Sequence, residues 1–184
     1  MRAMPNIAKY MLTTDIVYTY YVQVTMAHLL EKEISQTKPL SLVDQAAANL
    51  HRSSAVLLQE VASYLAENDI SPRQYNILRI LRGAGDTGLC CGDIAARMVT
   101  PDPDTTRLLD RLVKRKWIRR RHSDHDRRVV RVGMTASGLK LLATLETKVQ
   151  VIQHRQFQHL KKSELETLVA LLESLRKEKA THEP

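Results

Sequence analysis

Aromatic residues are scarce in this 184-residue chain, at 4% of its length. Proteins that bind single-stranded nucleic acid stack bases on aromatic side chains, so the scarcity argues against such a platform. The two cysteines, Cys90 and Cys91, are adjacent, a spacing that suits neither a disulfide framework nor a metal-ligand pair.

Long apolar runs are missing as well. The uncharged stretch at residues 16–30 contains Thr, Gln and His and is shorter than the roughly 20 mostly apolar residues that cross a bilayer. Asp15 interrupts any signal-like apolar region in front of it. We therefore expect a cytoplasmic protein with no membrane partner.

Positive charge is concentrated in one part of the chain. Residues 97–131 hold twelve Lys and Arg and five Asp, which gives +7 of the formal net charge of +8. Such a compact cationic element suits a polyanion, because each neutralised phosphate releases condensed counterions. Double-stranded DNA is the expected partner, although a basic run can also be a solvated face.

Apolar residues at three- and four-residue steps predict helices before and within this basic window. One runs from Ser41 to about Asn68. A second opens with Ser71, Pro72 and Gln74 as a capping box and ends near Gly83. A short helix at 92–98 and a third amphipathic helix follow, the latter with Asp102 as its expected N-cap and Pro103 at its first position. Two helices joined by a tight turn, the second of them basic, predict a helix-turn-helix.

After Lys116 the apolar period shortens towards two. Residues 117–121 and 129–134 are β-prone, and the polar segment 122–128 between them is typical of a turn. We predict a β-hairpin with a basic tip. An arginine at such a tip can enter the minor groove of DNA.

Two leucine-rich helices are expected to close the chain. Thr135 caps the first, which runs to about His159, and Ser163 with Glu166 forms a capping box for the second. Such helices can belong to the core of one chain or to an interface. Surplus amphipathic helix at both ends favours a dimerisation layer.

Four segments together resemble the multiple antibiotic resistance regulator (MarR) family of bacterial transcription factors. They read ISPRQYNILRIL, DIAARM, TTRLLDRLVKRKWIRRR and DHDRRVVRVGMTASG. The resemblance is specific over 70–142 and weaker over 41–177. It implies a mainly helical fold with a small β-hairpin: a winged helix-turn-helix over 70–137, dimerisation helices over 41–69 and 138–180, and an extension of unknown role over 1–40. It also implies a homodimer on a palindromic operator, with a ligand or oxidant changing the spacing of its two DNA-binding units.

The resemblance also implies functional residues. Asp126 and Arg128 match the family's D-x-R wing motif, in which the aspartate orients the arginine, and Arg107 and Arg111 fall on the recognition helix. The full set of DNA-contacting residues that we predict is Asp104, Thr105, Thr106, Arg107, Arg111, Lys114, Arg121, Arg127 and Arg128.

Three features depart from the family pattern. Asp102, Pro103 and Asp104 stand where relatives have Ser and Thr. Asp104 can accept from a cytosine amino group or can stabilise the helix N-terminus through its dipole, and we favour the dipole. Lys116 occupies the place of a helix-ending glycine, and residues 1–40 have no counterpart.

Other chemistry receives weaker support. Cys90 and Cys91 are candidate redox residues if Arg97 stabilises a thiolate, but we favour the simpler explanation that they are small buried residues at the start of a short helix. His122 and His125 have a spacing that could bind zinc, yet a hairpin tip more often meets phosphate or water. The sequence holds no phosphate-binding glycine loop and no coherent acid/base pair, so we expect neither an enzyme nor a cofactor.

These observations predict a dimeric, sequence-specific regulator of transcription, a repressor that a small ligand or other signal releases. Two alternatives stay open. One is a cysteine-based redox sensor on the same scaffold, and the other is a winged-helix module that binds protein or RNA.

Overall fold

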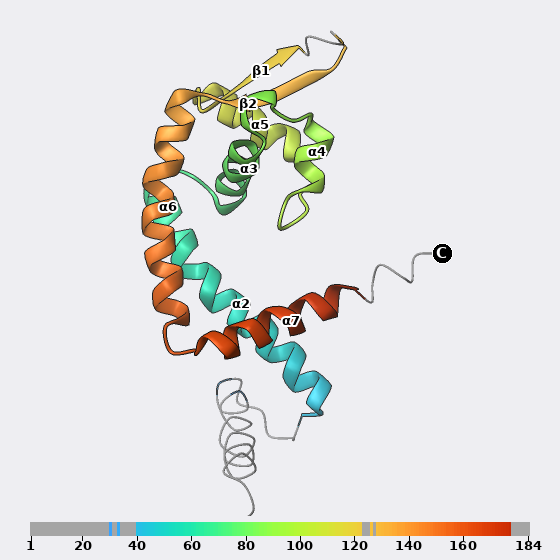
Figure 1. Cartoon of the computed structure of the whole chain (residues 1–184), viewed down its shortest axis with the longest axis vertical. Helices are drawn as coiled ribbons and strands as arrows, with labels where there is room; N and C mark the ends of the chain where they lie inside the picture. The colour runs from blue at the N-terminus through green and yellow to red at the C-terminus, as the bar shows by residue number, and fades with distance from the viewer. Residues whose placement is uncertain (1–29, 31–32, 34–39, 123–125, 127, 178–184) are drawn as a thin grey trace, which may run out of the picture. The chain divides into compact units, whose positions relative to one another are not determined.

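The computed structural model describes residues 30, 33, 40–122, 126 and 128–177 (Figure 1). Most of the predicted extension at 1–40, the tip residues His125 and Arg127, and residues 178–180 of the predicted C-terminal helix therefore lie outside the described part. The chain divides into two compact units, residues 1–56 and 57–184, and each is considered by itself. The boundary falls within the long helix α2.

The elements follow one another as helices, a hairpin and two further helices. In chain order they are α2 (Leu42–Glu67), α3 (Pro72–Gly83), the 3-10 turn η2 (Gly85–Thr87), α4 (Cys91–Ala96), α5 (Thr105–Lys114), β1 (Ile118–His122), β2 (Val130–Met134), α6 (Ala136–Phe157) and α7 (Lys162–Lys177). We call the part from α3 to β2, residues 72–134, the reading head. The predicted class, mainly helical with a two-stranded hairpin, matches this arrangement.

Helix α3 begins as the sequence predicts. The Ser71 hydroxyl accepts from the backbone N–H of Gln74, and the Gln74 side chain accepts from the Ser71 N–H, with Pro72 at the first helical position. Two of the otherwise unpaired donors at the helix start are thereby satisfied. The capping fixes where α3 starts, and its apolar side lies in the core of the reading head.

The start of the recognition helix differs from the prediction. Helix α5 begins at Thr105, with Asp104 rather than Asp102 at the N-cap. The Asp102 carboxylate instead accepts from the backbone N–H of Asp104 at 2.7 Å and pairs with Arg73 of α3 at 2.9 Å. Aspartate readily bonds to the backbone two residues on, and this local turn delays the helix.

The hairpin is supported by a third extended segment around Leu89. The sequence analysis did not predict this segment. Strands β1 and β2 pair antiparallel, with Arg120 opposite Val132. Leu89 forms an isolated bridge to Val132 through two backbone hydrogen bonds of 2.9 and 2.7 Å. Gly88 precedes it at φ +65°, and a Cβ there would meet the Val132 carbonyl. A single residue between glycine and cysteine carries no period-two signal, so only the structure reveals the bridge.

The end of α5 is built around an unusual lysine. Lys116 has φ 60°, the left-handed conformation in which helices commonly place glycine. Its N–H bonds to the Val113 carbonyl and the Trp117 N–H to the Leu112 carbonyl, the pair of bonds that defines a Schellman motif. Lys116 therefore stands at a position where the backbone is left-handed, and this is why the family pattern has a glycine there.

Helix α6 starts against that same turn. Thr135 caps the helix, as predicted, by accepting from the Gly138 N–H, and its hydroxyl also reaches the Lys116 and Trp117 carbonyls. A Cβ on Gly138 would overlap the Trp117 carbonyl. The T-x-x-G sequence thus allows α6 to lie directly on the backbone between α5 and β1.

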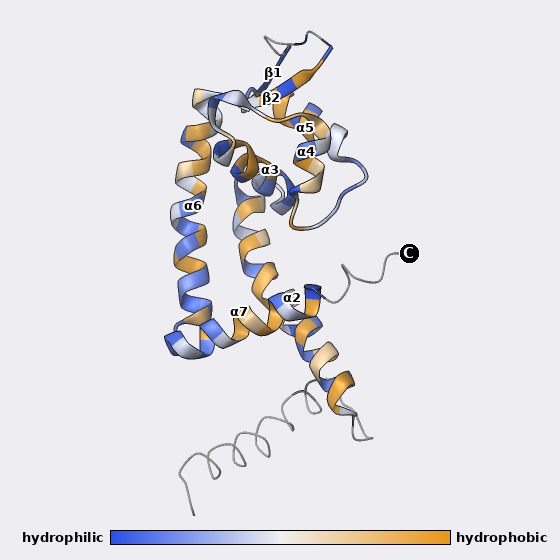
Figure 2. Ribbon diagram, turned by 45° about the vertical axis from the view of Figure 1, so that its right-hand side comes forward, coloured by the Kyte–Doolittle hydropathy of each residue, from blue (hydrophilic) through white to orange (hydrophobic). Residues whose placement is uncertain are grey.

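Burial is uneven along the chain. The core draws on α3, α4, α5, the hairpin and α6, with the side chains of Ile77, Ile94, Leu109 and Leu142 fully buried. Helix α7 contributes no buried residue, and in α2 only Leu65 is buried. Figure 2 shows apolar residues along both helices. The start of α7 also differs from the prediction, since the Glu164 carboxylate accepts from the Lys161 N–H, two residues ahead of the predicted capping box.

Candidate nucleic-acid interface

The turn before α5 is anchored to α3. The side-chain oxygen of Asn76 accepts from the Val99 N–H at 3.0 Å, and Arg73 pairs with Asp102. Inside the turn, the Thr105 hydroxyl donates to the Asp102 carbonyl at 2.7 Å and contacts the Met98 sulfur at 3.7 Å. These contacts fix the turn between α4 and α5, and with it the start of α5, against α3.

Thr105 is a correction to the predicted contact set. Its side chain is 4% exposed, and its hydroxyl is used within the turn. It therefore faces the core, and its burial argues against the DNA contact predicted for it. The neighbouring Thr106, by contrast, is exposed.

The outer side of α5 carries the other predicted residues. Arg107, Arg111 and Lys114 are all exposed. Asp104 makes no side-chain capping bond and instead lies 3.4 Å from Arg107, with both side chains largely open to solvent. Such an exposed pair is weak, so DNA phosphate can replace the carboxylate as the partner of Arg107.

The structure divides the basic residues into two groups. Five are held by other parts of the chain: Arg107 by Asp104, Arg115 by Asp69, Arg120 by Asp110, Arg121 by the Asp86 carbonyl and Arg131 by the Gly88 carbonyl. Within the described residues, six exposed cations of the basic window 97–131 make no side-chain hydrogen bond or ion pair: Arg97, Arg111, Lys114, Lys116, Arg119 and Arg128. We call the four that lie on α5 and the hairpin, Arg111, Lys114, Arg119 and Arg128, the free cations. Arg119 was not among the predicted contacts, because sequence alone cannot show which arginines of a run are already paired.

The described part of the wing explains the D-x-R motif. The Asp126 carboxylate accepts from the backbone N–H of Arg128 at 2.8 Å, and the Val129 N–H donates to the Asp126 carbonyl. The aspartate thus shapes the backbone at Arg128 and leaves the guanidinium exposed. The predicted contact at Arg127 lies outside the described residues.

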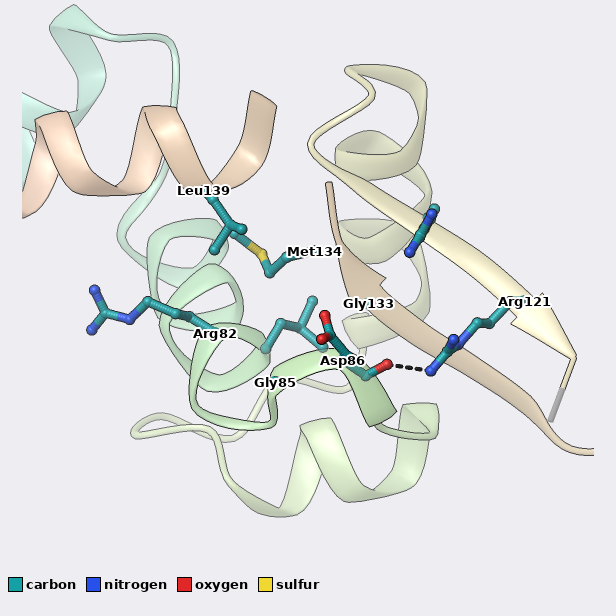
Figure 3. Close-up of a pocket in the computed structure, with 9 residues that line it drawn as sticks. Arg82, Gly85, Asp86, Arg121, Gly133, Met134 and Leu139 are labelled. Atoms are coloured by element: carbon teal, nitrogen blue, oxygen red, sulfur yellow. Dashed lines mark hydrogen bonds between the residues drawn. The ribbon is translucent and has the colours of Figure 1, made fainter. Parts of the chain in front are cut away.

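A small pocket of about 70 Å³ lies at the base of the wing (Figure 3). Arg82, Arg119 and Arg121 contribute its positive charge, and Asp86 is its only acid; its apolar part consists of Leu81, Met134 and Leu139. Figure 3 shows Arg121 reaching from β1 to the carbonyl of Asp86. The excess of arginine over acid suits a small anion.

The two cysteines point to different neighbours. Cys90 is the N-cap of α4, and its sulfur accepts from the Asp93 N–H at 3.4 Å. The Cys91 sulfur lies 3.6 Å from the hydroxyl oxygen of Thr106 on α5. Both are free thiols of intermediate burial. Among the described residues, neither thiol forms a hydrogen bond with Arg97.

Ion pairs also join the reading head to α6. Arg79 and Arg82 of α3 both pair with Glu146, whose side chain is 14% exposed. Burial raises the pKa of the nearby Tyr75 hydroxyl above its ordinary value, while Arg79 opposes that shift. In the described part of the chain, no group of three or more His, Cys, Asp and Glu could hold a metal ion, and no helix is long and apolar enough to cross a membrane.

Comparisons with known proteins give a consistent result. A model of the MarR family matches residues 68–129. The HTH-type transcriptional regulator YsmB of Bacillus subtilis is 30% identical over 114 residues, which are 62% of this chain and 77% of that protein. YfiV of the same organism, also an HTH-type transcriptional regulator, is 39% identical over 80 residues, which are 44% of this chain and 49% of that protein.

Solved structures extend the likeness beyond the reading head. A MarR transcription factor from Planctomyces limnophilus is 37% identical, with a TM-score of 0.57 over 74% of this chain and 98% of that one. MepR of S. aureus, solved as a complex with DNA, is 25% identical, with a TM-score of 0.65 over 72% of this chain and 96% of that one.

Proposed function

The chain belongs to the MarR family of winged-helix, DNA-binding transcription regulators, a family of non-enzymes, and from that premise we propose that it is a homodimeric repressor. Each subunit places α5 in the major groove of one half of a palindromic operator and Arg128 of the wing beside the minor groove. A signal, such as a small ligand, releases the dimer from DNA.

The observation that carries this proposal is the group of free cations. Arg111 and Lys114 lie on the outer side of α5, and Arg119 and Arg128 on the hairpin. An exposed guanidinium that is already paired must give up that partner before it binds phosphate, whereas these four need not. Each phosphate contact adds sequence-independent affinity and a salt dependence of about one counterion.

A second subunit is proposed because one recognition helix covers only a few base pairs. Two helices related by a twofold axis read half-sites about 34 Å apart, and their binding energies then combine through a high effective concentration. The exposed apolar residues of α7, among them Leu171 at 61% and Leu175 at 62% exposure, support α7 as part of the subunit interface.

Binding to the promoter of the protein's own gene, followed by fluorescence anisotropy over a range of salt, tests the proposal. We expect Arg128→Ala to weaken binding about tenfold and to lower the salt slope by about one for each subunit. Arg155→Ala is the matched control, since Arg155 lies on α6 and pairs with Glu60. Equal effects of the two variants, or no binding by the unmodified protein at low salt, would contradict the assigned surface.

The pocket at the base of the wing supports a small anion as the releasing signal. A carboxylate there would bind the guanidinium of Arg119 or Arg121, and a short hydrocarbon chain would contact Leu81 and Met134. Titration with straight-chain carboxylates from acetate to hexanoate, read as loss of DNA anisotropy, tests this site. We expect release to strengthen with chain length and to disappear in the double variant Arg119→Ala/Arg121→Ala, compared at protein concentrations that give equal DNA binding before the carboxylate is added; release that persists in the double variant excludes the pocket.

A thiol sensor is the second candidate, and one contact favours it. Because Cys91 lies against Thr106 of α5, any group added to its sulfur would meet the DNA-facing side of the recognition helix. Treatment with hydrogen peroxide should therefore release DNA from the unmodified protein and from Cys90→Ser, but not from Cys91→Ser. Release that is unchanged in Cys91→Ser removes this candidate.

A further inference from the structure

The C-terminal ends of α2 and α5 meet at a junction built from two similar helix ends. Helix α2 closes with the Ile70 N–H bonded to the Leu65 carbonyl and with Asp69 at φ 54°; α5 closes in the same way around Lys116 at φ 60°. Two non-glycine residues in left-handed conformation cost free energy and persist only where their surroundings hold them. The junction is therefore firmly determined by its contacts.

Arg115 is the side chain that joins the two helix ends. It donates to the backbone carbonyl of Asp69, and a second guanidinium nitrogen lies 3.8 Å from the Asp69 carboxylate. The same guanidinium lies over the Trp117 ring, 4.0 Å from its centroid. A flat, permanently charged group with several donors can make all three contacts at once, which an ammonium group cannot.

We propose that Arg115 is a positioning residue that sets the angle of the recognition helix α5 against the end of α2. This inference depends on the proposed function, in which α2 belongs to the dimerisation part and α5 reads DNA. Arg115 then controls the distance between the two recognition helices of the dimer. Its charge serves this contact and does not bind phosphate.

The lever geometry explains why one side chain has this effect. Helix α5 has 10 residues and is therefore about 15 Å long, and Arg115 lies directly after its last residue. Because the turn before α5 is anchored to α3, the reading head rotates about that end together with α5, and a small rotation moves the DNA-facing residues near the start of the helix by several ångströms. Each subunit still reads its own half-site after such a rotation, but the two half-sites are no longer reached together.

The test compares a full palindromic duplex, a single half-site duplex, and a series of duplexes whose half-site spacing varies by one base pair. In Arg115→Lys, which keeps the charge, we expect at least tenfold weaker binding to the full site, half-site binding within twofold of the unmodified protein, and a broader or shifted spacing optimum. Arg120→Lys is the matched control, because Asp110, at 2.7 Å, is the one side-chain partner of Arg120 among the described residues. It should leave all three measurements within about twofold.

Two further variants guard against a general loss of structure. Asp69→Asn keeps the carbonyl acceptor and a residue type that tolerates the left-handed conformation, so we expect a smaller loss of the same kind, selective for the full site. Trp117→Phe retains an aromatic face and should stay close to the unmodified protein, whereas Trp117→Leu should broaden the spacing optimum. Urea unfolding of each variant identifies any loss that affects the whole fold.

The outcomes separate the two proposals. Equal losses on full and half-sites in Arg115→Lys, or full-site binding and a spacing optimum unchanged in both Arg115→Lys and Asp69→Asn, overturn the positioning role. If the unmodified protein binds neither duplex, the proposed function itself fails, and the spacing series is then flat for every variant.

Discussion

The reading head and the terminal helices have similar apolar residues but bury them differently. In α5 of the reading head, Leu109 and Leu112 are fully buried, whereas α7 exposes Leu168, Val169, Leu171 and Leu175 by 36 to 62%. An apolar stripe at helical spacing is therefore compatible with either outcome. The difference teaches that the reading head completes its own core, whereas α7 needs further surface to cover its apolar side.

The largest loss of stability is expected at Gly138, where the start of α6 packs directly on the backbone of Trp117. Gly138→Ala would place a methyl group into the Trp117 carbonyl, and because that atom belongs to the backbone, α6 must move. We expect a loss of about 4 kcal/mol or more in the free energy of unfolding, measured by urea denaturation. Gly92→Ala, with nothing within 4 Å of the added Cβ, should be neutral or stabilise by less than about 1 kcal/mol.

A leucine-to-alanine substitution should lower the free energy of unfolding in both the reading head and α7, but only in α7 should the loss depend on protein concentration. Leu109→Ala leaves a cavity in a closed core and should cost about 3 kcal/mol at every protein concentration. Leu171→Ala should cost less, and its effect should vanish on dilution, because only association buries that side chain. Urea unfolding at several protein concentrations distinguishes them. A concentration-independent loss in Leu171→Ala would place α7 in the core of one subunit.

Charge on α7 should break association without unfolding the reading head. We expect Leu171→Lys combined with Leu175→Lys to raise the dimer dissociation constant about 100-fold, or about 2.7 kcal/mol, because burying two ammonium groups carries a large desolvation cost. Analytical ultracentrifugation measures the shift. Glu173→Lys, at another exposed position on α7, provides a control for added charge alone. A dimer unaffected by the double substitution would show that α7 is not part of the interface.

Sequence reasoning succeeded where local chemistry decides the structure. The capping box at Ser71 and the Thr135 cap each depend on residues three positions apart, and the hairpin depends on two neighbouring β-prone runs; all three are present. The start of α5 was wrong because Asp102 has two possible partners in sequence, the helix start and Arg73, and only packing against α3 selects between them.

The DNA-binding surface was predicted in outline but not residue by residue. The excess of positive charge located it, yet charge says nothing of which guanidinium is already held. Arg115 and Arg121 are bound by segments 46 and 35 residues away, and no periodicity connects such distant residues. Thr105 was predicted on the outer face or flank of the recognition helix, but it faces inward, and its hydroxyl donates to the Asp102 carbonyl and contacts the Met98 sulfur.

The smallest change in stability is expected at Lys116, where packing of the reading head holds a lysine in a left-handed conformation that its backbone disfavours. At φ 60° a lysine is disfavoured and glycine is not. Lys116→Gly should therefore raise the free energy of unfolding by about 1 kcal/mol, less the entropy that glycine adds to the unfolded chain.

Lys114→Gly, two residues earlier and still within α5, is the matched control and should lower the free energy of unfolding by about 1 kcal/mol. Thermal and urea unfolding of the two variants should thus move in opposite directions from the same lysine-to-glycine change. Loss of stability in both would mean that the Lys116 side chain contributes contacts that outweigh its strained backbone. A gain at Lys116 alone would show that packing of the reading head imposes the Schellman turn, and with it the angle between α5 and β1, against the backbone preference of lysine.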